Sequence, residues 1–175
     1  MKTYSSLLSI CFILIINFSF TQANLKEYKA GHPFNISVPD YMIRTVGLND
    51  AAVFQFKNEV KDVYGFVIED NKEELQIAEL NYGSITEFYD DFVKDFLVDE
   101  PKRKVSKPLL QKKGDINFLE SDLQYYDEDA ETTIYYLIGI VETKTSYYKV
   151  LSWCTSDNKE KFKSDLQKVI YSLND

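Results

Sequence analysis

Apolar residues recur along the chain in two groups of strand-like segments, each followed by a helix-like segment. Alternating apolar and polar side chains, the period of a half-buried strand, begin at Phe34 and recur up to residue 68. The predicted strands cover 34–38 with its continuation 42–46, 51–56 and 63–68. A polar leading segment, 24–32, precedes them, and the spacing over 72–81 fits a strand as well as a helix. The first group therefore predicts a meander of three strands.

A long helix follows, and its first turn carries a capping box from Ser84 to Glu87. In this motif the Ser84 hydroxyl accepts a hydrogen bond from the Glu87 amide, and the Glu87 carboxylate accepts one from the Ser84 amide. Apolar residues then recur at helical spacing and form one stripe: Ile85, Phe88, Tyr89, Phe92, Val93, Phe96 and Leu97. Because Phe92 lies in the middle of this stripe, we expect its ring in the core.

The second half repeats the order of strands and then a helix. Strands are predicted over 116–126, 132–141 and 147–153. The centre of the middle strand, 137–141, is apolar without interruption, which is typical of a sheet covered on both faces. Asp157 with Glu160 predicts a second capping box and a closing helix. The fold class is α+β: an antiparallel sheet of about six strands in two meanders, between a long central helix and a C-terminal helix.

The first residues have the pattern of a secretory signal peptide. Lys2 precedes an apolar run from Leu7 to Phe20, and Thr21-Gln22-Ala23 places small residues where signal peptidase reads them. The run is short for a membrane span, which needs about 20 apolar residues. We therefore expect a signal peptide over 1–23 and a single exported domain over 24–175, periplasmic or extracellular. An uncleaved N-terminal anchor is the alternative.

The charge of the chain narrows the classes of partner. The net charge is −8 over the whole sequence, and loss of Lys2 with the signal peptide makes it −9. So acidic a chain is a poor match for nucleic acid, because phosphate contacts need clustered basic charge. After residue 23 no apolar run is long enough to span a bilayer, so we expect no membrane span after cleavage. Basic residues gather in the polar stretch 99–115, where Lys102, Arg103 and Lys104 would dock an acidic protein partner. A solvated loop that balances an acidic body is the alternative interpretation. We expect the protein itself to be a monomer.

Reactive side chains are few. His32 is the single histidine, and Cys154 is the single cysteine after residue 23. A nucleophilic pair also needs a third group that orients the base, and nothing in the sequence brings these residues together. The acidic turn 127–131 has oxygen ligands for calcium but lacks the spacing of a calcium loop. The sequence therefore does not decide whether this turn binds calcium; a solvated turn is the alternative. We expect no enzyme activity, no cofactor and no metal centre.

Tyrosine doublets mark three of the predicted strands, at 125–126, 135–136 and 147–148. Neighbouring residues of a strand point to opposite faces, so each doublet gives one ring to each side of the sheet. Tyr126, Tyr136 and Tyr148 are the candidates for a groove that binds a small molecule or lipid. Packing in the core is the alternative.

In order and in local motifs, the chain resembles the PsbP-like superfamily, which includes bacterial DcrB-like proteins. The resemblance covers nearly all of 24–175. Its motifs are Phe34-Asn35-Ile36-Ser37-Val38-Pro39, Val53-Phe54-Gln55-Phe56, Ser84-Ile85-Thr86-Glu87-Phe88-Tyr89, the tyrosine hairpin at 135–136 and 147–148, Trp153 and Val169-Ile170-Tyr171-Ser172-Leu173.

The resemblance implies an antiparallel sheet between helices, an α/β/α sandwich, and non-enzymatic proteins that bind or stabilise partners. It carries over no functional residue. Together, these features predict a non-catalytic binding or accessory protein of the cell envelope or exterior with an unknown protein partner. The alternative is a small-molecule or lipid carrier that uses a tyrosine-lined groove between sheet and helix.

Overall fold

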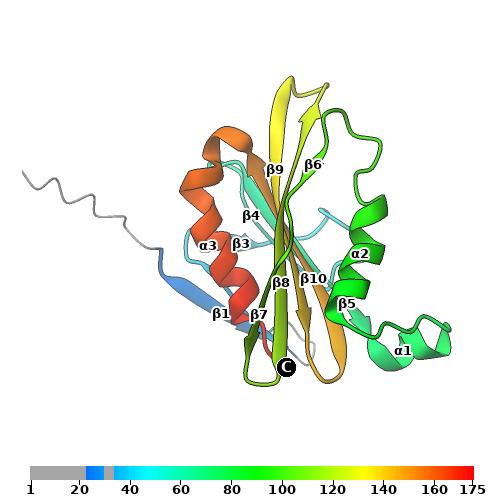
Figure 1. Cartoon of the computed structure of the whole chain (residues 1–175). Helices are drawn as coiled ribbons and strands as arrows, with labels where there is room; N and C mark the ends of the chain where they lie inside the picture. The colour runs from blue at the N-terminus through cyan, green and yellow to red at the C-terminus, as the bar shows by residue number, and fades with distance from the viewer. Residues whose placement is uncertain (1–22, 30–33) are drawn as a thin grey trace, which may run out of the picture.

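The computed structural model describes residues 23–29 and 34–175, in which antiparallel strands form one large and one small sheet (Figure 1). The large sheet has eight strands, in the order β3-β4-β5-β10-β9-β8-β6, with β7 also paired to β8. Their bounds are Ile43–Arg44 (β3), Phe54–Asn58 (β4), Val63–Asn71 (β5), Lys104–Val105 (β6), Leu109–Lys113 (β7), Ile116–Asp127 (β8), Thr132–Glu142 (β9) and Ser146–Thr155 (β10). The expected six strands were too few, because short edge strands complete the sheet on both sides.

The first meander was predicted wrongly at its N-terminal end. The leading segment holds a strand, β1 (Leu25–Lys29), which pairs with β2 (Asn35–Pro39) in a separate two-stranded sheet. Within β2, Ile36 and Val38 are fully buried beside the C-terminal helix, and the Ser37 amide donates to Ser172 Oγ at 2.9 Å. Tertiary packing against that helix therefore takes β2 out of the large sheet.

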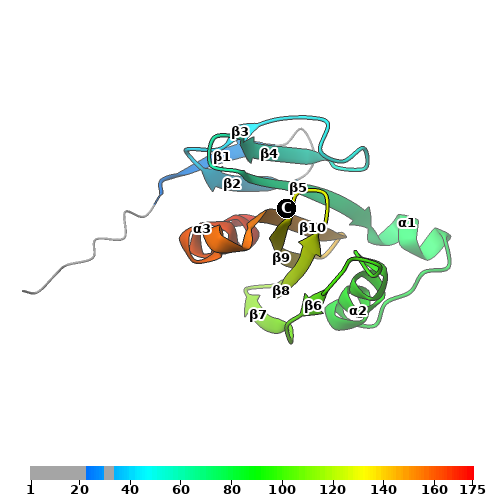
Figure 2. The same ribbon diagram turned by 90° about the horizontal axis from the view of Figure 1, so that it is seen from above.

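Two helices cover opposite faces of the large sheet, as Figure 2 shows from above. They are α2 (Ile85–Asp95) on one face and α3 (Lys159–Ser172) on the other. Each face has its own hydrophobic core, and the alternating residues of β9 serve both. A Cβ at Gly139 would lie 2.5 Å from the Ile170 side chain, so the glycine lets α3 approach the central strand closely. The doubly covered strand predicted over 137–141 is confirmed.

Helix α2 begins as predicted, with Ser84 Oγ accepting from the Glu87 amide at 3.2 Å. The Glu87 carboxylate, however, accepts from the Gly83 amide at 2.7 Å instead of from the Ser84 amide. The helix ends at Asp95, earlier than its apolar stripe suggested, and Phe92 is half-buried. Phe92 therefore packs against the core under α2 but is not fully buried, so the expectation of a core position holds only in part. The fully buried residues of the helix are in its first half, at Ile85, Phe88 and Tyr89.

The remaining helices are set by local capping and by polar contacts with the sheet. The ambiguous stretch 72–81 contains a short helix, α1 (Lys72–Ile77), whose N-cap Asn71 accepts from the Glu73 and Glu74 amides. The second capping box, predicted from Asp157 and Glu160, does not form at the start of α3. A 3-10 turn (η1, Ser156–Asn158) precedes α3, and its N-cap makes no side-chain hydrogen bond. Helix α3 is instead held to β8 through Asp122, which pairs with Lys159 and Lys163 at 2.9 and 2.8 Å.

Candidate functional site

One edge of the large sheet is exposed along β6 and β7, two short strands that pair in succession with the same side of β8. All five residues of β7 are exposed, and none of its side chains enters either core. Leu109 and Leu110 are 52% and 57% exposed, which is unusual for two adjacent leucines in a strand. We call residues 102–113 the basic edge.

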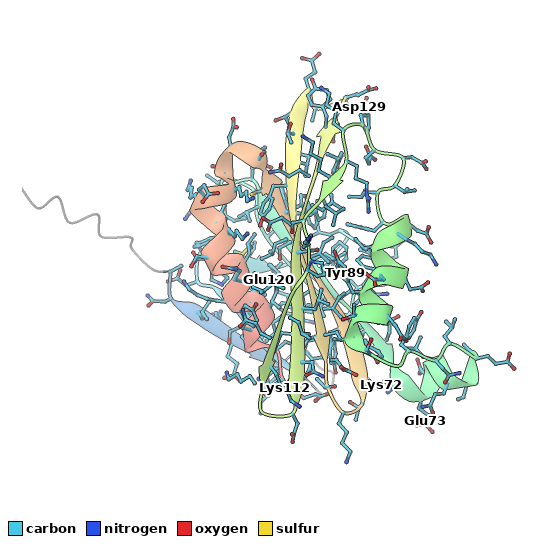
Figure 3. The ribbon with its side chains drawn as sticks, viewed as in Figure 1. Lys72, Glu73, Tyr89, Lys112, Glu120 and Asp129 are labelled. Atoms are coloured by element: carbon cyan, nitrogen blue, oxygen red, sulfur yellow. The ribbon has the colours of Figure 1, made fainter. Side chains whose placement is uncertain are left out.

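The basic edge joins these leucines to a run of positive charge. It contains six basic residues and no acidic residue: Lys102, Arg103, Lys104, Lys107, Lys112 and Lys113. Acidic side chains outnumber basic ones elsewhere in the chain, so the edge is a local exception on a protein of net charge −8. Figure 3 labels Lys112 and Asp129 at opposite ends of the sheet, so this lysine lies far from the acidic turn.

The three predicted docking residues have different roles. Arg103 is half-buried, and its guanidinium donates to the carbonyl oxygens of Phe96 and Val93 at the end of α2. The Lys102 ammonium lies 4.3 Å from the centre of the Tyr126 ring, a cation–π contact. Lys104 is exposed in β6. The structure therefore places Arg103 in a helix-capping contact and leaves Lys104 available on the surface.

The lysines on the basic edge differ in their contacts from lysines elsewhere. Several lysines elsewhere are ion-paired, for example Lys72 at the start of α1 with Glu142 at 2.9 Å and Lys149 of β10 with Asp70 at 2.8 Å. Among the described residues, no salt bridge or side-chain hydrogen bond occupies the ammonium groups of Lys104, Lys107, Lys112 and Lys113. The sequence pointed to this stretch through its basic residues, but the predicted docking residues were Lys102, Arg103 and Lys104 and did not include Lys107, Lys112 and Lys113.

The predicted groove tyrosines do not line one groove. Tyr148 is fully buried on the α3 face, where its hydroxyl donates to Glu69 and Asp175, each at 3.3 Å. Tyr136 lies on the α2 face, stacked on Trp153 at 5.3 Å between ring centres. Tyr126 lies near the C-terminal end of β8, where the Lys102 ammonium lies over its ring. Strand alternation places Tyr136 on the opposite face from Tyr148, and Tyr126 lies away from Tyr148 at that end of β8. Core packing and cross-strand stacking account for Tyr136 and Tyr148.

A shallow cavity of about 160 Å³ lies beside α1, between Lys72, Tyr82 and Tyr147. The Lys72 ammonium is already bound by Glu142, by the Thr143 carbonyl oxygen at 2.8 Å and by the face of Tyr147 at 4.6 Å. Burial and the nearby Glu142 carboxylate raise the pKa of Tyr147 to about 12, so its hydroxyl stays protonated at neutral pH. Lys72, Glu142 and Tyr147 thus interact with one another in the wall of this cavity.

Of the reactive residues and the acidic turn named from the sequence, the structure describes Cys154 and the turn 127–131. Cys154 is buried in the core under α3, and burial raises the pKa of its thiol to about 12, so it stays protonated at neutral pH. His32 lies outside the described residues. In the acidic turn, Asp127 Oδ1 accepts from the amides of Asp129 and Ala130 at 3.0 and 2.9 Å. Within 23–29 and 34–175, no three His, Cys, Asp or Glu side chains gather as a metal site.

Solved structures of known proteins share this architecture. The cyanobacterial PsbP protein of Synechocystis matches with a TM-score of 0.60 and 16% identity over 87% of this chain and 93% of that one. The chain has a PsbP-like fold. Two further structures share it: LpqN of Mycobacterium tuberculosis, described as involved in cell envelope biogenesis, and a Pseudomonas aeruginosa protein of unknown function described as a putative regulator.

The PsbP-like similarity is one of architecture. LpqN has a TM-score of 0.55 at 10% identity, covering 86% of this chain and 90% of that one. The Pseudomonas protein has a TM-score of 0.52 at 9% identity, covering 86% and 96%. No protein-family model and no curated protein sequence matches the chain. The expected PsbP-like fold is confirmed, with a larger sheet than expected. No helix in the described part of this PsbP-like chain is long and apolar enough to cross a membrane.

Proposed function

We propose that this protein is an exported, non-catalytic accessory protein of the cell envelope or exterior, which binds an acidic protein partner through its basic edge. One observation carries the proposal: Lys104, Lys107, Lys112 and Lys113 lie unpaired beside the exposed Leu109 and Leu110. Exposed apolar residues within a patch of one charge are typical of protein interaction sites. The envelope role described for LpqN, which shares the fold, is consistent with this setting.

The proposal is tested by reversing charge at the basic edge. A photo-crosslinking residue replaces Leu110 in the native host, and the double variant Lys107→Glu with Lys112→Glu is compared with the unaltered edge. We expect a discrete crosslinked protein that is lost in the double variant, because two attractive charges become repulsive. Raised salt should weaken the crosslink as well, since these charges are exposed and are screened.

A matched control reverses two exposed lysines elsewhere, Lys29 and Lys144, which changes net charge equally. Crosslinking should survive in this control and also in a variant with His32 and Cys154 both replaced by alanine. Equal loss in both charge variants would mean that net charge, not the basic edge, governs binding. Loss only in the His32 and Cys154 variant would reopen a catalytic role.

A further inference from the structure

We propose that the partner binds by strand addition: an extended, acidic segment pairs with the free edge of β7 and extends the large sheet. This inference rests on the proposed function and adds the mode of binding and the chemistry of the bound segment. In strand addition, main-chain hydrogen bonds give affinity and alternate side chains give specificity. The occupant is a peptide segment whose carboxylates face the lysines of the basic edge.

The backbone of β7 has free hydrogen-bonding groups on its outer side. Its connection to β8 is a two-residue turn, Gly114-Asp115, and Gly114 has a φ of +60°. Residues that flank such a turn form a hydrogen-bonded pair, and paired and unpaired positions then alternate along the ladder. With Lys113 opposite Ile116, this alternation directs the Leu110 and Lys112 amides away from β8. Those two residues therefore offer donors and acceptors to an added strand.

The opposite edge of the large sheet, formed by β3, is a poorer site for strand addition. There, β3 has only two residues, Ile43 and Arg44, which is too short for a stable ladder. The five-residue β7 is bounded by Pro108, which has no amide hydrogen, and by the turn at Gly114. The length of β7 therefore limits the paired part of an added strand to about five residues, which is a common strand length.

The side chains of β7 favour one kind of segment. Leu109 is opposite Glu120, whose side chain meets α3, whereas Leu110 is opposite Leu119 in the core under α2. An added strand therefore finds one exposed leucine on each face of the sheet. Beside them, Lys112 and Lys113 repel the same edge of a second copy, since edge lysines prevent self-pairing, and they attract carboxylates. A segment with both acidic and apolar residues would therefore contact the exposed leucines and pair its carboxylates with the lysines.

A ten-residue peptide of alternating valine and glutamate, acetylated and labelled with fluorescein, serves as the probe. Its affinity is measured by fluorescence polarisation with the domain 24–175. A second peptide has the same sequence but carries an N-methyl group on every residue, which removes the main-chain donors along both edges and keeps the charge. We expect the N-methylated peptide to bind the unaltered protein about tenfold more weakly than the unmodified peptide does. We also expect the unmodified peptide to bind the Lys107→Glu, Lys112→Glu protein about tenfold more weakly than it binds the unaltered protein. Amide exchange of the complex should show new protection at Leu110 and Lys112.

The outcomes separate the two proposals. Equal binding of both peptides, with weaker binding only after charge reversal, overturns strand addition and leaves docking at the basic edge intact. Binding that is insensitive to charge reversal, with Lys29→Glu and Lys144→Glu as the matched control, contradicts the proposed function itself. Absence of measurable binding at millimolar peptide, or protection elsewhere than β7, also overturns strand addition.

Discussion

Arg103 shows how the role of one residue depends on its contacts. In the sequence it lies between two lysines and resembles them, but its planar guanidinium reaches back to two carbonyl oxygens near the end of α2. Those carbonyls belong to the last turn of the helix and its C-cap, where no further helical amide can satisfy them. A charged fork suits this position better than the flexible ammonium of lysine does.

We expect Arg103→Ala to lower the free energy of unfolding by about 2 kcal/mol, because it removes charge-assisted hydrogen bonds from a half-buried position. Lys104→Ala, at the exposed neighbouring position, should change it by less than about 0.5 kcal/mol. Urea titration followed by circular dichroism measures both. Equal effects would mean that Arg103 contributes only to the surface charge.

At the scale of elements, α2 packs unevenly on the sheet. Phe88 is 4% exposed and its ring stacks on Tyr147 at 4.3 Å, whereas Phe92, one turn later, is half-buried. The apolar spacing of the helix is regular, but the sheet is twisted and a straight helix diverges from it. The end of α2 is therefore held by Arg103 and by contact of Phe96 with Tyr136 at 5.5 Å.

We expect Phe88→Ala to cost about 3–5 kcal/mol of unfolding free energy, the range for a fully buried ring. Phe92→Ala should cost clearly less, about 1–2 kcal/mol, because its ring is only partly buried. The difference between the two variants in denaturant titration is the decisive quantity. A larger loss for Phe92 would place the centre of the helix interface nearer to its C-terminal end.

At the scale of the whole molecule, ion pairs join α3 to the sheet and make stability depend on pH. Partial burial of Asp122 opposes its ionisation, but hydrogen bonds from Lys163, Lys159 and Tyr135 outweigh burial and lower its pKa. A carboxyl with a lowered pKa in the folded state stabilises the protein above its unfolded pKa. That contribution is lost as pH falls through the lower, folded value.

We therefore expect stability to decrease as pH falls below about 4, the ordinary range for an aspartate. Asp122→Asn should be less stable than the unaltered protein at pH 7, and its stability should fall less steeply in acid because the titrating group is gone. Thermal unfolding between pH 7 and pH 2 tests this. Parallel pH curves for the two proteins would contradict a role for Asp122 in the acid response.

The N-terminal boundary is also a property of the whole molecule. Strand β1 begins at Leu25, and the Asn24 carbonyl oxygen accepts from the Asp40 amide at 2.7 Å, so the small sheet starts next to the predicted cleavage position. We expect export with cleavage after Ala23, so that the mature protein begins at Asn24. Intact mass of the protein from the extracytoplasmic fraction tests this, and retention of residues 1–23 in membranes would contradict it.

Local patterns in the sequence determined much of the fold. Periodicity placed the long strands β8, β9 and β10 and both long helices, and Ser84 marked the start of α2, because these signals depend on neighbouring residues alone. The tyrosine doublets were correctly located in strands, and the excess of basic residues over 102–113 can be read directly from the sequence. None of these signals specifies which distant residues meet.

Only the tertiary structure decided the remaining features. Long-range pairing moved β2 into a small sheet beside α3, placed Tyr136 and Tyr148 on opposite faces, and joined β6 and β7 into one exposed edge of β8. Tertiary contacts also bind the Arg103 guanidinium to carbonyl oxygens at the end of α2. They leave the described ammonium groups of Lys107, Lys112 and Lys113 without an ion pair. The physical reason is that strand order and the pairing of charges depend on which surfaces are buried together, and contacts between residues far apart in the chain decide that burial.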